Sequence, residues 1–269
     1  MKEKIAVVTK AEMVSSSVRR DILAAIENDG GFSLSVLPDA GKITDESAVL
    51  VFGGDGTVLE AIRAIDGKDL PLLCVNLGNL GFLAEYEKDV SANQVVCALK
   101  NGKVTEKMLL CVKTGDFCER ALNEVVVKSL TSRPIYVDVY VDGVFVDSYH
   151  SDGAIVSSPT GSTAYSLSAG GPILAPDVEA FVINPICAHS LHSRPLVVSA
   201  TSKVELRLKS DCAGVCVDGK SSFAMQNGDV VCVSKSQETA KFIRTRDEDF
   251  YKKLLQKMNR WGTTECTEG

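Results

Sequence analysis

The sequence predicts an α/β fold followed by a β-rich one, in two domains. Two observations carry this prediction. Over the first hundred residues, apolar strands alternate with helices, which is the βαβ rhythm of a doubly wound parallel sheet. From about residue 106 the pattern changes to short strands of alternating apolar and polar residues, which is typical of antiparallel β structure. A chain of 269 residues is long enough for two such domains.

Each element of the first half has its own signal. Residues 5–8, 32–37, 48–52 and 71–75 are apolar runs of strand length. A helix is predicted over residues 58–65. Apolar residues at helical spacing predict another helix between the first two strands, at Val14, Val18, Ile22, Leu23 and Ile26.

The second half has hairpin signals. Residues 136–141 and 144–146 flank Asp142-Gly143, a pair that favours a two-residue β-turn. Residues 204–208 also alternate, and Asp218-Gly219 predicts another turn. The chain then returns to a helix with one apolar face that needs a surface to cover it, formed by Phe250, Tyr251, Leu254, Leu255 and Met258.

Composition narrows the class of partner. A hydrophobic content of 45% and a charged content of 24% are ordinary for a globular protein. A net charge of −6 and a pI near 5.2 argue against nucleic-acid binding, which needs a basic surface. The start lacks the apolar core of a secretion signal, and no apolar stretch is long enough to cross a bilayer. We therefore expect a cytoplasmic protein with a small-molecule partner and no membrane association.

The nine cysteines are odd in number and scattered, and most lie in strand-like runs such as those around Cys111 and Cys232. This pattern predicts small core residues in a reducing compartment. Only Cys212 and Cys216 are close in sequence, and they lack the paired spacing of a zinc site. No metal-ligating cluster is predicted.

A glycine-rich loop carries the first chemical signal. Gly53, Gly54 and Gly56 surround Asp55 and are followed by Thr57, directly after the strand at 48–52. Ligands bind at this edge of open α/β sheets, and glycines let backbone N–H groups approach phosphate oxygens. A carboxylate in a phosphate site is costly unless it holds a metal ion or accepts a proton. The alternative is a tight turn with a helix-capping aspartate.

Two further segments extend this signal. Residues 76–82 form a glycine-bearing loop after the next strand, so both loops lie on one edge of the sheet. Residues 157–172 follow the apolar run 154–156 and are dense in Ser, Thr and Gly. Such a segment suits a backbone-lined site for a sugar, an amide or a base.

Four segments together resemble the NAD kinases, which phosphorylate the adenosine 2′-hydroxyl of NAD with ATP or, in some members, polyphosphate. They are residues 53–57, residues 76–82, the pair Asn123-Glu124, and Asp152-Gly153 leading into 160–168. The first loop is shared with diacylglycerol kinases, sphingosine kinases and phosphofructokinases. The block at 159–171 together with Asn123-Glu124 is the more specific part.

The resemblance implies a doubly wound amino-terminal domain, a β-sandwich-like second domain, and a last helix that packs back on the first. The implied boundaries are residues 1–105 with 240–269 for the α/β domain and 106–239 for the NAD-binding domain. The last helix would then have a partner for its apolar face. A homodimer or homotetramer is also implied, and exposed edges of a β-rich domain suit such an assembly.

By resemblance, Asp55 is the general base that takes the proton of the ribose hydroxyl. The donor site would be lined by Gly53, Gly54, Gly56 and Thr57. No Walker lysine motif is present, so Mg²⁺ or another divalent cation would neutralise more of the donor charge.

The same resemblance assigns NAD contacts. Asn123 and Glu124 would contact the adenosine portion, and Asp152 the dinucleotide, at a ribose hydroxyl. The block that surrounds the adenine and nicotinamide ends comprises Thr160, Thr163, Ala164, Tyr165, Ser166, Leu167 and Ser168.

Three further candidate site residues have weaker support from the sequence. Lys220 stands where many relatives have Gln, and His150 where Arg is frequent; both are candidate contacts to the phosphates or amide of the cofactor. For His150 the alternative is a half-exposed strand residue. Arg63 could offset donor charge, although an arginine on a helix is more often a surface residue.

Two other functions stay open from the sequence alone. A lipid or sugar kinase could carry the same first loop, but the β-rich half shows no acyl cleft or arginine-rich site. A dinucleotide sensor could keep the pocket without chemistry, but it would gain nothing from Asp55. The sequence does not choose between ATP and polyphosphate, or between NAD and NADH.

Overall fold

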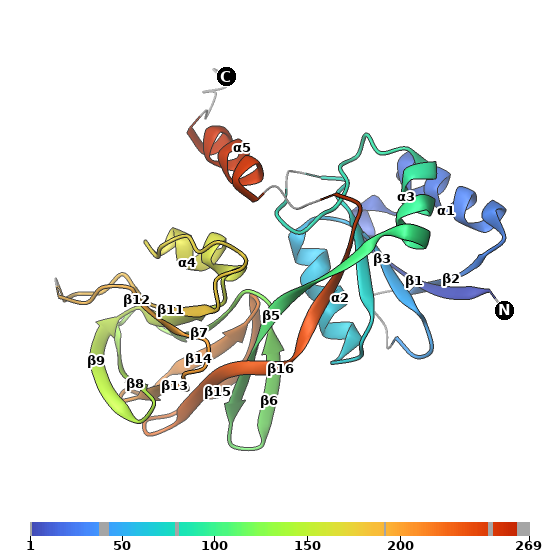
Figure 1. The fold of residues 1–269 in the computed structure, drawn as a ribbon. Coiled ribbons are helices and arrows are strands. Elements are labelled where there is room, and N and C mark those ends of the chain that lie inside the picture. Colours follow the sequence, from blue (N-terminus) through green and yellow to red (C-terminus); the bar gives the residue numbers. More distant parts are fainter. Residues whose placement is uncertain (1, 38–42, 79–80, 191, 247–249, 263–269) are drawn as a thin grey trace. The chain divides into compact units, whose positions relative to one another are not determined.

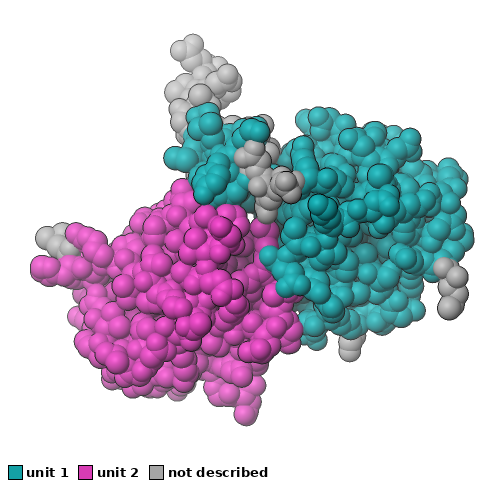
Figure 2. Space-filling model, in the orientation of Figure 1, with its two compact units in different colours: residues 1–106, 240–269 teal, residues 107–239 magenta. Residues whose placement is uncertain are grey.

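The computed structural model describes residues 2–37, 43–78, 81–190, 192–246 and 250–262. The chain divides into two compact units, residues 1–106 with 240–269 and residues 107–239, which Figure 2 colours separately. Asn79 and Leu80 of the second predicted loop lie outside the described residues, as does Cys266.

Unit 1 is built on parallel strands in the order β2-β1-β3-β4 (Figure 1). Their bounds are β1 (Glu3–Thr9), β2 (Phe32–Leu37), β3 (Ala48–Phe52) and β4 (Pro71–Val75). The chain leaves β1 first to one side and then to the other, so the topological switch point lies between β1 and β3. The end of β16 (Val230–Arg244) continues the sheet, because Lys241 and Phe242 pair with Pro71 and Leu72.

Helices cover both faces of this sheet. Helices α1 (Ser17–Asp29) and α3 (Ala92–Asn101) pack on Ile5, Val7, Leu50 and Phe52 of the strands. The alternate strand residues are equally buried on the other face, where α2 (Asp55–Ile65) contacts β1 and β3. The doubly wound prediction is confirmed.

Two helix predictions needed correction, and one helix was missed. Val14 is not part of α1: it follows the short helix η1 (Ala11–Met13) and is 51% exposed. Helix α2 begins at Asp55, three residues earlier than predicted, because Gly54 adopts an extended N-cap conformation. Helix α3 was missed, although Ser91 and Gln94 form a capping box at its start.

Unit 2 is a sandwich of antiparallel strands. One sheet has the order β12-β11-β10-β7-β14-β15. Its strands are β7 (Glu124–Ser129), β10 (Gly153–Ser157), β11 (Ala180–Ile186), β12 (Leu196–Ser199), β14 (Ala213–Val217) and β15 (Lys220–Met225). Opposite it, β16 pairs with β13 (Val204–Leu208), β13 with β8 (Ile135–Val141), and β8 with β9 (Val144–Ser151). Strand β5 (Lys103–Thr114) pairs with β16 and with β6 (Phe117–Ala121). Buried residues of both layers, such as Val125 and Phe181 from one and Val139 and Leu206 from the other, form a single core.

Both predicted turns are present. Asp142 and Gly143 join β8 to β9 with φ values of 51° and 80°, and Asp218 and Gly219 join β14 to β15 with φ values of 46° and 75°. Positive φ at both turn residues matches the twist of a two-residue hairpin. The predicted strand at 204–208 is β13.

The last helix, α5 (Phe250–Gly262), packs on unit 1, as expected, but only part of its apolar face is covered. The Phe250 ring lies 6.3 Å from that of Phe82. Tyr251, Leu255 and Met258 are 70%, 59% and 50% exposed, so the predicted burial of these three is wrong. The surface beneath α5 presents carbonyl oxygens and a carboxylate, which lysines of the helix contact instead.

The prediction that most cysteines are core residues is also wrong. Of the eight described cysteines, all free, only Cys74 and Cys216 are buried. Four are exposed because they lie outside the apolar strand faces, namely Cys97, Cys118, Cys187 and Cys212. No described helix is long and apolar enough to cross a membrane.

Candidate functional site

Asp55 is held at the start of α2 by two backbone amides. Its Oδ2 accepts a hydrogen bond from the Phe82 N–H at 3.0 Å, and its Oδ1 accepts one from Leu83 at 3.1 Å. These amides follow the loop after β4, and Asp55 follows β3, so neighbouring strand ends meet at this carboxylate. Its side chain is 31% exposed. A carboxylate that accepts two N–H groups keeps lone pairs for a further donor.

Two glycines leave room for the side chains of Asp55 and Thr57. A Cβ on Gly81 would lie 2.3 Å from the Asp55 carboxylate, and a Cβ on Gly53 would lie 2.3 Å from the Thr57 hydroxyl. The Gly53 N–H donates to the Val75 carbonyl, so this amide holds the loop to β4. At Gly54 and Gly56 a Cβ would meet nothing within 4 Å, which leaves the outer side of the loop open.

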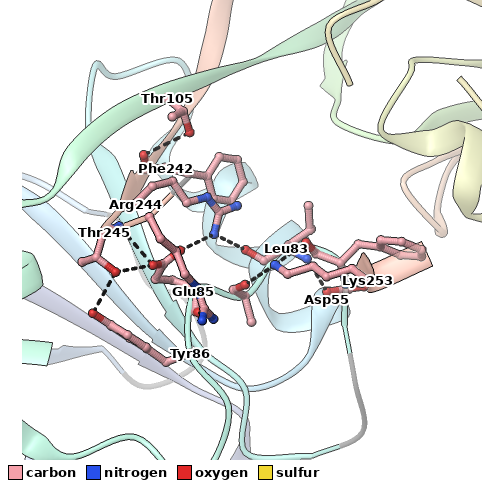
Figure 3. A network of polar contacts seen from close by, with 12 residues as sticks. Asp55, Leu83, Glu85, Tyr86, Thr105, Phe242, Arg244, Thr245 and Lys253 are labelled. Carbon is pink, nitrogen blue, oxygen red and sulfur yellow. Dashed lines mark hydrogen bonds and ion pairs between the residues drawn. The ribbon is translucent and has the colours of Figure 1, made fainter. Parts of the chain in front are cut away.

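A network of polar contacts fixes the segment that holds Asp55 (Figure 3). Arg244 donates to the Leu83 carbonyl at 3.1 Å and lies 3.4 Å from a carboxylate oxygen of Glu85. The other Glu85 oxygen accepts from the N–H of Thr245 at 3.0 Å. The side chains of Arg244 and Glu85 are only 3% and 4% exposed. The end of β16 therefore positions residues 82–86.

Two lysines of α5 also contact Asp55 or the segment that holds it. Lys253 donates to the Ala84 carbonyl at 2.8 Å. The Lys257 ammonium lies 3.7 Å from Asp55 Oδ2 and 3.9 Å from the centroid of the Phe82 ring. Burial lowers the pKa of Lys257, although the nearby Asp55 carboxylate acts in the opposite direction.

In unit 2, Asp218 organises the Asn123-Glu124 pair. Its carboxylate accepts three backbone N–H groups, from Leu122 at 2.7 Å, Asn123 at 2.8 Å and Glu124 at 3.1 Å. The N–H of Asp218 in turn donates to the Glu124 carbonyl at 3.0 Å. The turn between β14 and β15 is thus also the support of a predicted binding segment.

Glu124 is 6% exposed and lies in an unusual electrostatic environment. Burial, and next the neighbouring Asp218 carboxylate, raise the pKa of Glu124 to about 8, against the effect of a Tyr165 N–H donor. Near neutral pH this carboxyl group is therefore mainly protonated, and it can donate a hydrogen bond.

The block after β10 packs tightly on this pair. A Cβ on Gly161 would lie 2.0 Å from the Asn123 carbonyl oxygen, and the Ser158 N–H donates to that same oxygen at 2.9 Å. The block forms two short helices, η3 (Gly161–Thr163) and α4 (Tyr165–Ser168). The structure therefore brings two of the predicted segments together within unit 2.

Buried oxygens without hydrogen-bond partners surround α4. They are Oε2 of Glu124 and the side-chain oxygens of Ser157, Ser166 and Asn184. Ser157 pairs directly with Glu124 across β10 and β7, and Asn184 donates to the Ser166 carbonyl at 3.0 Å. Unpartnered buried oxygens cost free energy, which a bound polar molecule or water recovers.

The remaining predicted residues of the block differ in exposure. Tyr165 and Ser168 are exposed, Thr160, Thr163, Ala164 and Leu167 are half-buried, and Ser166 is buried. Asp152 is exposed between β9 and β10. Partial burial of the Tyr165 hydroxyl raises the pKa of Tyr165, and the nearby Cys187 and Asp152 act in the same direction. The Thr163 hydroxyl donates to the Thr160 carbonyl at 3.1 Å.

Three candidates lie away from these groups or engage in other contacts. Arg63 is in the last turn of α2, eight residues from Asp55 and thus about 12 Å away along the helix axis. The His150 ring stacks on Tyr136 with centroids 4.3 Å apart and contacts the His189 ring at 4.7 Å. Lys220 is exposed at the start of β15.

Sequence reasoning missed the supporting residues. Glu85 and Arg244 are 159 positions apart, so no local pattern connects them. Asp218 was noticed only as a turn residue. For Lys253 and Lys257 a signal existed: both fall on the helix face of Phe250, at spacings of three and four residues.

A glycine-bordered carboxylate lies at the carboxyl edge of a parallel sheet, and the second unit is a β-sandwich with buried polar residues. This combination is typical of a small-molecule kinase that uses a nucleotide. Two family models match: the ATP-NAD kinase N-terminal domain over residues 37–104 and the ATP-NAD kinase C-terminal domain over residues 122–245. The chain belongs to the NAD kinase family.

Relatives and solved structures agree. The chain is 38% identical to an NAD kinase of Geobacter sp. over 261 residues, which covers 93% of this chain and 87% of the relative. It is 40% identical to a bifunctional NADP phosphatase/NAD kinase of Methanococcus maripaludis, but spans only 39% of that longer protein. An Archaeoglobus fulgidus NAD kinase solved with ATP has a TM-score of 0.83 at 28% identity, covering 95% of this chain and 98% of that one. A yeast NADH kinase solved with NADH shares the fold, with a TM-score of 0.85 at 22% identity and 99% and 90% coverage.

Proposed function

We propose that this chain is an NAD kinase, which transfers a phosphoryl group from ATP to NAD and yields NADP. One observation carries the chemistry: the Asp55 carboxylate is held by two backbone amides at the ligand-binding edge of the parallel sheet. The membership in the NAD kinase family supports the choice of substrates.

Asp55 acts as the general base in this proposal. The adenosine 2′-hydroxyl oxygen of NAD forms a bond to the terminal phosphorus of ATP, the bond to the leaving ADP breaks, and Asp55 accepts the hydroxyl proton. Phosphoryl transfer mainly needs alignment and charge neutralisation, and the proton is collected late. The two amide donors hold the Asp55 carboxylate in a fixed orientation for this role.

Gly53, Gly54, Gly56 and Thr57 form the donor loop in this proposal. Its open outer side at Gly54 and Gly56 supports that role. The described residues contain no group of three His, Cys, Asp or Glu side chains that could hold a metal ion. Mg²⁺ usually keeps several waters and binds through substrate phosphates, so the phosphates of ATP would hold the ion in this proposal. The ion would supply charge neutralisation at the phosphates.

The acceptor contacts lie in unit 2. We assign Asn123 and Glu124 to the adenosine portion of NAD and the block at 160–168 to its two ends, with Asp152 at a ribose hydroxyl. The buried, unpartnered oxygens around α4 support binding of a polar ligand there. Glu124, protonated near neutral pH, is suited to donate a hydrogen bond to a ribose or base acceptor.

Replacement of the proposed base tests the reaction. We expect Asp55→Asn to keep NAD binding and to lose turnover by about 10²- to 10⁴-fold, the contribution typical of a general base. NADP formation is measured with an NADP-specific dehydrogenase, and NAD binding by calorimetry. Glu60→Gln, an exposed acid on the same helix, is the control. Normal turnover of Asp55→Asn would refute the assignment.

The substrate is tested on the unaltered chain. NAD, NADH, diacylglycerol and fructose 6-phosphate are offered with Mg-ATP or polyphosphate, and ADP or phosphate release is followed. Phosphorylation of a lipid or sugar with NAD untouched would overturn the proposal. Tight NAD binding without any ADP release would favour a sensor.

A cytoplasmic location belongs to the same proposal, since the eight described cysteines are all free thiols, as in a reducing compartment.

A further inference from the structure

Lys257 is the cation nearest to the proposed base among the contacts described for Asp55. Its ammonium lies 3.7 Å from Asp55 Oδ2, and its side chain is only 18% exposed. The Phe82 ring covers one side of the ammonium, with its centroid 3.9 Å away. A surface lysine usually keeps its ammonium in water and lies along apolar groups with its stem only. Lys257 instead places its charged end beside the reacting carboxylate.

Helix α5 fixes this placement through neighbouring residues on the same face. Phe250 packs on Phe82, and Lys253 donates to the Ala84 carbonyl at 2.8 Å. Lys257 follows Lys253 by four residues, so the two side chains project from the same side of the helix. The segment that holds Asp55 through its amides is therefore the segment on which α5 docks.

Asp55 only partly compensates the charge of Lys257. Burial lowers its pKa, and the attraction of Asp55 only partly offsets that effect. The ammonium has thus lost more hydration than one carboxylate replaces. A phosphate group next to Asp55 would supply the missing negative charge, because an anion within hydrogen-bond reach of an ammonium stabilises its charged form.

We propose that Lys257 is a donor-site residue whose ammonium contacts the phosphoryl group in transfer, while Asp55 takes the acceptor proton. This inference rests on the proposed function. A base within about 3 Å of the hydroxyl, and a hydroxyl about 3 to 3.5 Å from the phosphorus, put the phosphoryl oxygens within reach of a lysine beside the base. Lysines of phosphate-binding loops do this elsewhere, and this chain has no such loop motif. The lysine keeps its proton throughout the reaction.

The test compares Lys257→Met, Lys257→Gln and Lys257→Arg, with Lys252→Met as the control, since Lys252 is an exposed lysine of the same helix. For the two neutral variants we expect kcat/KM for ATP to fall about 10²- to 10³-fold, as when one transition-state donor is lost. The affinity for a non-hydrolysable ATP analogue with Mg²⁺ falls about 10- to 100-fold, because a hydrogen bond to a charged group is removed. The KM for NAD, the melting temperature and the Lys252→Met variant stay unchanged. Lys257→Arg keeps the charge and recovers most of the analogue affinity.

Each outcome either supports or overturns the role proposed for Lys257. Normal analogue affinity and normal turnover in Lys257→Met, with Asp55→Asn inactive, overturn the inference and leave the proposed function in place. Activity in both Lys257→Met and Asp55→Asn overturns both. Unfolding of both neutral variants assigns Lys257 a structural role and also overturns the inference. A loss of turnover with unchanged analogue affinity contradicts a phosphate contact and leaves only an effect on Asp55.

Discussion

Glu124 is a buried acid whose charged form is disfavoured both by burial and by a neighbouring carboxylate. It is 6% exposed, and the Asp218 carboxylate lies close because it accepts a hydrogen bond from the Glu124 N–H. These two effects raise the pKa of Glu124 to about 8 from the ordinary value of 4.5. The folded chain therefore holds a proton at Glu124 over a pH range in which the unfolded chain has released it.

The consequence is a pH-dependent stability. Below about pH 4.5 the residue is protonated in both states and its favourable contribution is complete. As the pH rises toward 8, the unfolded state gains by ionisation while the folded state does not, and stability falls by up to about 1.4 kcal/mol per pH unit. We expect Glu124→Gln to remove this slope, so that the variant gains stability relative to the unaltered chain at pH 8.

Urea unfolding at pH 5, 6, 7 and 8 measures the effect. Glu119→Gln, which removes a half-exposed carboxylate on β6, is the control and should leave the slope in place. Parallel pH profiles for the unaltered chain and Glu124→Gln would contradict a raised pKa at this residue.

At the scale of elements, the end of β16 supports residues 82–86 through a buried ion pair. Arg244 and Glu85 are 3% and 4% exposed, and Arg244 also donates to the Leu83 carbonyl. Since the N–H of Leu83 bonds to Asp55, the strand acts on the proposed base through one residue. The Arg244–Glu85 ion pair thus helps to position Asp55 within unit 1.

Removal of one partner takes away the opposite charge beside a buried ionised group. We expect Glu85→Gln and Arg244→Met each to destabilise the chain by about 3 to 5 kcal/mol in urea unfolding, as for other broken buried pairs. The double variant Arg244→Met/Glu85→Gln should lose less than the sum of the two. Lys235→Ala, which breaks an exposed pair with Glu179, should cost about 1 kcal/mol or less. Additive losses in the double variant would show that the two side chains are not coupled.

At the scale of the whole molecule, the chain carries an exposed apolar strand edge. Strand β9 ends its sheet, and Val144, Phe145 and Val146 on it are 66%, 53% and 41% exposed. An unpaired apolar edge favours association with another chain. This edge supports the expectation of a homodimer or homotetramer.

Light scattering after size exclusion measures the mass. We expect twice or four times the 28.8 kDa of one chain, and a mass of 28.8 kDa at micromolar concentration would contradict the prediction. If β9 lies in the interface, Val144→Lys lowers the mass, whereas Val104→Lys, at a comparably exposed valine on β5, does not.

Local patterns predicted the strands β1 to β4 and both turns well. β1 to β4, the hairpin at Asp142-Gly143 and the last helix all follow from apolar periodicity or turn residues, which act between near neighbours in sequence. They predicted burial less well. Val14 and Tyr251 are apolar at helical spacing yet exposed, because periodicity shows that a face exists but not what covers it.

The sequence by itself determined the two-part architecture, the glycine-bordered Asp55 and the Asn123-Glu124 pair, since each is encoded by adjacent residues. Only the tertiary structure decided how these groups are held. The amides of Phe82 and Leu83 reach Asp55, the Asp218 carboxylate supports Glu124, and Lys257 comes from the other end of the chain. Such contacts join residues 27 to about 200 positions apart. Their geometry depends on how strands and helices pack, and no local pattern of residues records it.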